Sequence, residues 1–164
     1  MKHITFKPIY LEKNGGLGNA LRLALEKASY ELVARMDSDD VSRPDRFAVQ
    51  SEFLDTHKDV AVIGAYIQEF SDICENLGVR KFPLDTDGAK KLIYKANPLA
   101  HPAVMMRKSM FDDGISYDEN YRTSQDLALW FDILTAGYNV ANIDKVLLNF
   151  RRNDSVYKLS LIHI

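Results

Sequence analysis

Residues 31–47, ELVARMDSDDVSRPDRF, decide how the chain is interpreted. Leu32, Val33 and Met36 predict a short buried strand, and this strand leads directly into the acidic run DSDD at 37–40. Three carboxylates within four residues repel one another, so collecting them is costly without a cation. Open α/β sheets place ligands at the carboxyl ends of their strands, and carboxylate oxygens suit Mg²⁺ or Mn²⁺. The spacing predicts a cation site or, equally well, an acidic turn that caps the next helix.

Helix-like and strand-like stretches alternate along the chain. The periodicity predicts helices at 17–28, 44–57, 89–96 and 123–137, and strands at 4–10, 31–36, 60–64, 65–70, 79–82, 103–106, 138–143 and 146–150. Ser42 with Asp45, and Thr123 with Asp126, have the spacing of capping boxes. A polar turn is expected at 71–78 and a polar, aromatic loop at 111–122. This alternation predicts an α/β fold with a mixed or parallel sheet covered by helices.

The composition is that of a single globular domain. The 164 residues include 21 basic and 23 acidic side chains, which gives a net charge of −2, and 46% of the residues are hydrophobic. These values exclude a disordered tail and a strongly basic nucleic-acid binder, so no nucleic-acid partner is expected. Cys74 is the only cysteine, and no stretch has the pattern of a signal peptide or a membrane span. A cytoplasmic location is therefore expected.

Single residues further along the chain offer weaker signals. Asp126 fits a helix cap better than a general base, although one side chain could serve as both. His101 in a loop could bind a phosphate or a hydroxyl, and the pair Arg151-Arg152 could clamp a pyrophosphate, but taken alone both patterns favour ordinary solvated polar residues. The glycine-rich run 14–18 opens a helix and matches neither common nucleotide-binding pattern. No His and Cys spacing predicts a zinc site.

Taken in order, these motifs resemble a known family. The segments that carry the resemblance are KNGGLGNA (13–20), ARMDSDD (34–40), PDRF (44–47), NPLAHPAVM (97–105), QDLALW (125–130) and FRRN (150–153). They are similar to family 2 glycosyltransferases with the GT-A fold. The resemblance implies a Rossmann-like mixed sheet flanked by helices, without the family's first strand–helix–strand block. It also implies a partial GT-A domain over 1–156, with a tail at 157–164 that follows no family pattern and is interpreted as a candidate non-native end.

The resemblance implies a metal site and a base. Asp37 and Asp39 correspond to the family's Asp-x-Asp pair, which would hold Mn²⁺ or Mg²⁺. Asp39 is the expected direct ligand, and Asp37 faces the ribose or a metal-bound water as an alternative. Asp126 corresponds to the base that takes the acceptor hydroxyl proton, so that one displacement inverts the anomeric carbon.

The remaining implied roles concern substrate binding. They fall on Asp40, His101, Gln125, Trp130 and Arg151. His101 and Trp130 are expected to line the cleft, and Gln125 stands where the family usually has Glu. The implied partners are a nucleotide-sugar donor and a saccharide or lipid-linked acceptor, with peripheral association at the inner face of the membrane. The alternatives are a non-catalytic GT-A-like binding domain and, with less support from the motif order, a metal-dependent phosphohydrolase.

Overall fold

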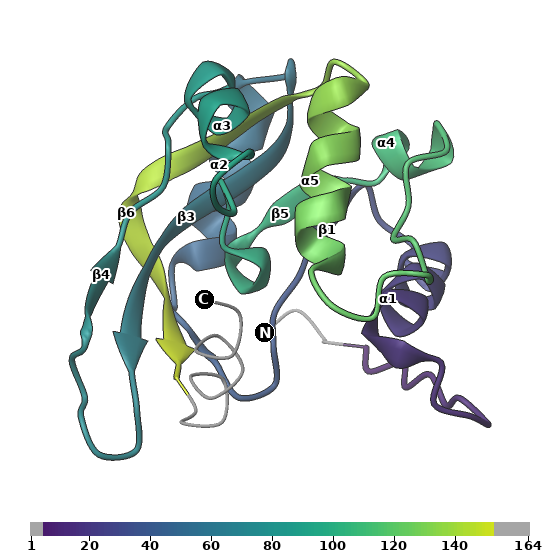
Figure 1. Ribbon diagram of the computed structural model, residues 1–164, viewed down its shortest axis with the longest axis horizontal. Coiled ribbons are helices and arrows are strands. Elements are labelled where there is room, and N and C mark those ends of the chain that lie inside the picture. Colours follow the sequence, from purple (N-terminus) through teal and green to yellow (C-terminus); the bar gives the residue numbers. More distant parts are fainter. Residues whose placement is uncertain (1–4, 153–164) are drawn as a thin grey trace.

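The sheet is built around one long strand, β3 (Val60–Phe70), in a computed structural model that describes residues 5–152 (Figure 1). The strand order is β1-β5-β3-β6-β2, and β4 also pairs with β3. The bounds of the other strands are β1 Leu32–Ala34, β2 Val41–Ser42, β4 Gly78–Arg80, β5 Met105–Arg107 and β6 Asn139–Arg151. β3 runs parallel to β6 and antiparallel to β4 and β5. The expected mixed sheet is therefore confirmed.

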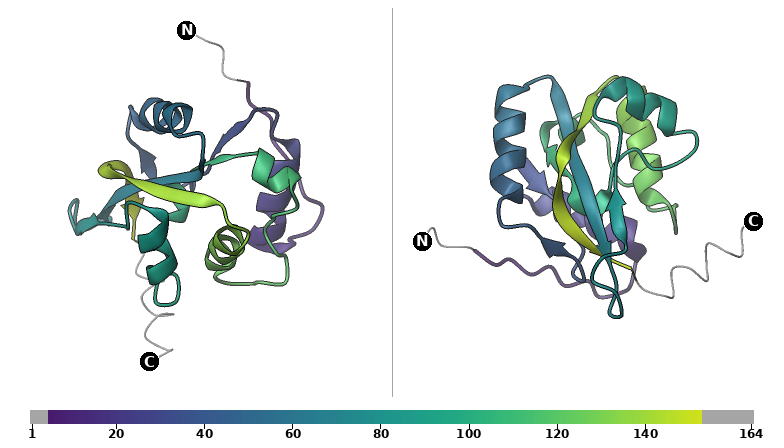
Figure 2. Two further views of the ribbon diagram at one scale, coloured as in Figure 1. Left: turned by 90° about the horizontal axis from the view of Figure 1, so that it is seen from above. Right: turned by 90° about the vertical axis from the view of Figure 1, so that its left-hand side faces the viewer.

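Helices cover both faces of this sheet. The helices are α1 Gly16–Lys27, α2 Arg46–Thr56, α3 Thr86–Leu92, α4 Ser109–Asp112, α5 Gln125–Thr135 and the 3₁₀ turn η1 His101–Ala103. Figure 2 shows α2 on one face and α3 and α5 on the other. Leu54 of α2 packs with Ile63 on the first face, whereas Leu129 and Ile133 of α5 pack with Val62 on the second. Apolar side chains that alternate along β3 therefore bind helices on both sides.

The strands predicted separately at 60–64 and 65–70 form the single strand β3, and those predicted at 138–143 and 146–150 form the single strand β6. The predicted break in β3 falls at Gly64, where a Cβ atom would meet the Asn142 side chain of β6. The glycine therefore permits a close approach between strands and does not mark a turn. In β6 the register passes from Ile143 to Val146 between neighbouring residues of β3, so Asp144 and Lys145 form a bulge within one strand.

Several local expectations are wrong. Among residues 5–10 there is no strand, and Phe6 and Tyr10 are largely exposed. β1 is half-buried, and within residues 5–152 it pairs only with β5, so the expected buried strand lies at a sheet edge. A short helix, α4, overlaps the start of the loop expected at 111–122. Residue 4 and the predicted tail 157–164 lie outside the described residues.

Neither predicted capping box forms. Ser42 belongs to β2 and pairs with Leu148, while Asp45, the N-cap of α2, makes no side-chain cap and instead accepts a hydrogen bond from Lys145. α5 begins after Ser124, which has a left-handed φ of 59° and makes no side-chain cap. The cap interpretation of Asp126 is therefore wrong. None of the helices described in residues 5–152 is long and apolar enough to cross a bilayer.

Candidate functional site

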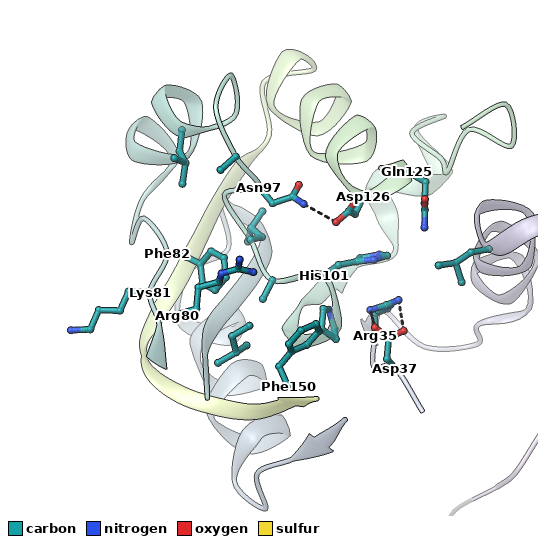
Figure 3. A pocket seen from close by; sticks show the side chains of 17 residues that line it. Arg35, Asp37, Arg80, Lys81, Phe82, Asn97, His101, Gln125, Asp126 and Phe150 are labelled. Carbon is teal, nitrogen blue, oxygen red and sulfur yellow. Dashed lines mark hydrogen bonds and ion pairs between the residues drawn. The ribbon is translucent and has the colours of Figure 1, made fainter. Parts of the chain in front are cut away.

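A cavity of about 710 Å³ lies beside the end of β1 and the first turn of α5 (Figure 3). It is lined by Leu17, Arg35, Asp37, Ile67, Arg80, Lys81, Phe82, Leu92, Ala96, Asn97, Leu99, Ala100, His101, Pro102, Gln125, Asp126 and Phe150. Four of the residues singled out in the sequence meet here, although they lie up to 89 positions apart: Asp37, His101, Gln125 and Asp126. The other four, Asp39, Asp40, Trp130 and Arg151, are not in the lining.

Asp37 lines the cavity as half of an ion pair. The Arg35 guanidinium donates two hydrogen bonds to its carboxylate, at 2.7 and 2.6 Å. Arg35 is buried, whereas the Asp37 side chain is about one-third exposed. Two parallel N–H···O bonds fix the orientation of the carboxylate as well as compensating its charge. The first carboxylate of the acidic run is therefore held in place before any ligand binds.

Asp40 and Arg151 hold the acidic run against the end of β6. Asp40 is buried and its Oδ1 accepts a hydrogen bond from the Arg151 backbone N–H at 2.8 Å. Burial raises the Asp40 pKa to about 6. The Arg151 guanidinium lies over the Phe70 ring, pairs with Asp72 and donates to the Asp39 carbonyl oxygen at 3.0 Å. Both residues fix the loop, and the structure does not place either in the cavity lining.

Asp126 projects into the cavity from the first turn of α5. Its Oδ2 accepts a hydrogen bond from Asn97 Nδ2 at 2.9 Å, as the dashed line in Figure 3 shows. Gln125 precedes it in the lining. The sequence motifs assigned no role to Asn97, although it is the first residue of the segment NPLAHPAVM that carries part of the family resemblance. A neutral amide thus orients the predicted base without neutralising it.

His101 is buried in the cavity wall between Asp37 and Asp126 (Figure 3). Its Nε2 lies 2.7 Å from the Tyr117 hydroxyl, in a bond whose direction depends on the tautomer. Burial lowers the His101 pKa to about 3, with the positive charge of Arg35 adding to the effect, so the ring is neutral at physiological pH. Burial raises the pKa of Tyr117, which keeps the phenol protonated as well. Tyr117 is a second residue that sequence analysis missed.

Trp130 lies behind His101 and not in the cleft, contrary to expectation. It is fully buried, and its ring meets His101 edge-on, with centroids 5.8 Å apart. The helical stripe that contains Trp130 also carries Leu134, so this face of α5 packs into the core. Trp130 therefore supports the ring of His101 from within the protein.

The donor set of the acidic run fits a hard divalent cation. Asp37 brings carboxylate oxygens to the cavity, and Asp39 follows two residues later in the same loop. Within residues 5–152, no group of three or more His, Cys, Asp or Glu side chains is arranged to hold a metal ion. A cation at this loop would thus depend on one or two carboxylates and on oxygens from a bound phosphate, an arrangement common for Mg²⁺.

The sequence profile described as Glycosyl transferase family 2 matches residues 2–115. The chain belongs to this family. The resemblance that the motifs carry is thereby confirmed, and the profile covers the acidic run as well as His101.

Curated relatives within the family include two bacterial enzymes. The Amylovoran biosynthesis glycosyltransferase AmsE of Erwinia amylovora is 35% identical over 141 residues, covering 86% of this chain and 52% of that protein. The UDP-Gal:alpha-D-GlcNAc-diphosphoundecaprenol beta-1,3-galactosyltransferase of Escherichia coli is 33% identical over 150 residues, covering 92% and 54%. The chain spans about half the length of the curated relatives it matches.

The fold is similar to that of S. aureus TarS. The TarS 1-349 structure in complex with UDP-GlcNAc superposes with a TM-score of 0.66 at 21% identity, covering 88% of this chain and 41% of that one. The complex with UDP gives a TM-score of 0.65 at 20% identity, covering 90% and 44%. The expected GT-A architecture, a mixed sheet flanked by helices, is confirmed.

Proposed function

We propose that the protein transfers a sugar from a nucleotide-diphosphate sugar to a saccharide or lipid-linked acceptor, with inversion, in the synthesis of a bacterial surface polysaccharide. The observation that carries the proposal is the placing of Asp37 and Asp126 in the lining of one cavity, with His101 in the same wall. The names of the two bacterial relatives and the UDP and UDP-GlcNAc bound by TarS support this assignment of substrate.

In this proposal Asp39, as a direct ligand, and Asp37, as the second carboxylate, would hold Mn²⁺ or Mg²⁺ for the donor diphosphate. The cation, when bound, neutralises the diphosphate and stabilises it as a leaving group. Arg35 keeps the Asp37 carboxylate oriented toward the cavity. Asp40 and Arg151 contribute by fixing the loop against β6 and not by contacting the substrate.

Asp126 is the proposed general base. Its carboxylate takes the proton from the acceptor hydroxyl as that oxygen attacks the anomeric carbon, and the bond to the diphosphate breaks on the opposite side. A single displacement of this kind inverts the configuration. Asn97 orients Asp126, and Gln125 and the neutral His101 supply uncharged polar contacts for sugar hydroxyls. The apolar surface of Ile67, Phe82 and Phe150 gives the acceptor a face on which to pack.

The E. coli relative's name includes a diphosphoundecaprenol acceptor, which supports a lipid-linked acceptor here. Such an acceptor would bring the protein to the inner face of the membrane from the cytoplasm. Calorimetry with UDP and Mn²⁺, followed by turnover of UDP-galactose and UDP-GlcNAc, tests the proposal. Binding that requires the cation, together with sugar release to an acceptor, is expected. Binding without turnover would favour the non-catalytic binding domain, and absence of both would overturn the proposal.

A further inference from the structure

Helix α2 carries two fully buried polar side chains, Arg46 and Gln50, on the sheet face opposite α5 (Figure 2). Arg46 Nε donates to Gln50 Oε1 at 3.0 Å, so the two side chains form one unit. Neither lines the cavity. Burial lowers the Arg46 pKa to about 10, which still leaves the guanidinium charged at neutral pH.

The Arg46–Gln50 unit binds backbone carbonyls of three neighbouring chain segments, which belong to or adjoin β1, β3 and β5. Arg46 Nη2 donates to the carbonyl oxygens of Arg35 and Val104, at 2.7 and 3.1 Å. Gln50 Nε2 donates to the carbonyl oxygens of Ala103 and Ile63, at 2.8 and 3.2 Å. The ladder between β1 and β5 ends with the bond from the Arg35 N–H to the Val104 carbonyl. The two side chains thus tie together the ends of β1 and β5 and the adjoining part of β3.

The backbone on both sides of this junction leads directly into the cavity. Two residues after the Arg35 carbonyl comes Asp37, and two residues before the Ala103 carbonyl comes His101. The position of Asp37 relative to His101 therefore depends on the backbone carbonyls that Arg46 and Gln50 bind. We infer that Arg46, with Gln50, is a positioning residue that fixes the acidic loop against the His101 turn from behind the sheet.

A contribution to stability does not by itself explain a buried guanidinium at this junction. Arg46 donates its hydrogen bonds to uncharged acceptors, and the Asp40 carboxylate offsets only part of the cost of burying its charge. Hydrophobic residues of similar volume often stabilise a fold as well as or better than buried ionic groups. What a hydrophobic residue cannot supply is a planar group whose Nη2 donates to the Arg35 and Val104 carbonyls while its Nε holds Gln50. The junction therefore depends on both donor atoms of Arg46.

The test uses the whole chain with Arg46→Lys and Gln50→Met, and NMR titration of the His101 ring. In the wild type, His101 stays neutral between about pH 5 and 7. Loosening of the junction admits water to the ring, so we expect both variants to raise the His101 pKa by about one unit or more. Arg43→Lys is the matched control, because Arg43 is exposed, and Leu54→Val destabilises α2 without removing a hydrogen-bond donor of the junction. Both controls should leave the His101 titration unchanged.

The expected effect of these variants on ligand binding rests on the proposed function, whereas the positioning role of Arg46 and Gln50 does not. We expect Arg46→Lys to weaken cation-dependent UDP binding about tenfold. If the His101 titration shifts while the wild type itself binds no UDP, the positioning role stands and the proposed function fails. If Arg46→Lys does not fold, Gln50→Met decides the question. An unchanged His101 titration in a folded Gln50→Met variant, or in folded variants of both residues, would overturn the inference.

Discussion

The two polar walls of the cavity hold their carboxylates in different ways. On the wall formed by the acidic run, Asp37 is paired with a cation, Arg35, which compensates its charge. On the wall formed by η1 and α5, Asp126 is bound by a neutral amide, and His101 is bound by a neutral phenol. Asp37 on the first wall already has a positively charged partner and could pair with a metal cation instead. Asp126 on the second wall has no cationic partner in the described hydrogen-bond network. This difference supports the proposed roles of the first wall as a cation site and of the second wall in proton transfer.

Replacing Asp126 tests the second wall most severely. Asp126→Asn keeps the shape of the side chain but removes the base, so sugar transfer should fall by about 10²–10⁴-fold while cation-dependent UDP binding is retained. Asp132→Asn is the matched control, because Asp132 lies exposed on the same helix. Steady-state turnover and calorimetry measure the two effects. Equal losses of UDP binding and turnover would mean that both walls serve the donor and that the comparison is wrong.

Replacing Asp39 tests the first wall. Asp39→Asn removes one carboxylate from the proposed cation site, so UDP affinity in Mn²⁺ should fall about tenfold to a hundredfold. Affinity measured in EDTA should be equally low for the variant and the wild type. The matched control is Asp55→Asn, since Asp55 is exposed on α2 and pairs with Lys58. An Asp39→Asn variant that still responds fully to Mn²⁺ would remove this loop from the cation site.

Local sequence patterns predicted most of the fold. The strand before the acidic run, the strand segments that make up β3 and β6, and the apolar stripes of α1 and α5 all fall close to the predicted ranges. Two of the failures come from distant partners. β2 exists because Val41 pairs with Asn149, and Asp45 is bound by Lys145, 100 residues away, instead of capping its own helix. No local pattern contains such information.

The same distinction applies to the candidate site. Motif order was enough to name Asp37, His101, Gln125 and Asp126, which the structure brings to one cavity. The residues that orient them were missed, because Asn97 and Tyr117 become informative only once their partners, 29 and 16 positions away, are known. The Trp130 error has a different cause, since a helical stripe shows which residues share a face but not which of them ends in a cavity.

The protonation of His101 sharpens the contrast between the walls. Its folded pKa is about 3, while the unfolded chain takes up the proton near its ordinary value of about 6.5. As pH falls below about 6.5, the unfolded state binds more protons, so His101 lowers the free energy of unfolding by up to roughly 1.4 kcal/mol per pH unit. Asp40, whose folded pKa is raised to about 6, acts in the opposite direction as pH falls from there toward its ordinary value.

A His101 variant separates the contributions of His101 and Asp40 to the pH dependence of the free energy of unfolding. His101→Gln removes the first contribution and leaves the second, so the free energy of unfolding of the variant should gain on the wild type as the solution is acidified. Urea unfolding at a series of pH values measures this difference. Parallel curves for the two proteins would mean that His101 is not held neutral in the wall, and the contrast with the charged wall would then be lost.

The smallest expected effect concerns Asn97, which donates a hydrogen bond to Asp126, the proposed base. Asn97→Leu keeps the volume of the side chain but removes its hydrogen bond to Asp126. A hydrogen bond to a charged group contributes about 1.5 kcal/mol or somewhat more, but water entering the open cavity replaces part of it. We therefore expect kcat to fall about fivefold, with the donor KM unchanged, because only proton transfer depends on the direction of the carboxylate. A variant that raises the donor KM and leaves kcat intact would place Asn97 and Asp126 on the donor side of the cavity. In that case both walls would serve one substrate, and the base would have to be sought elsewhere in the lining.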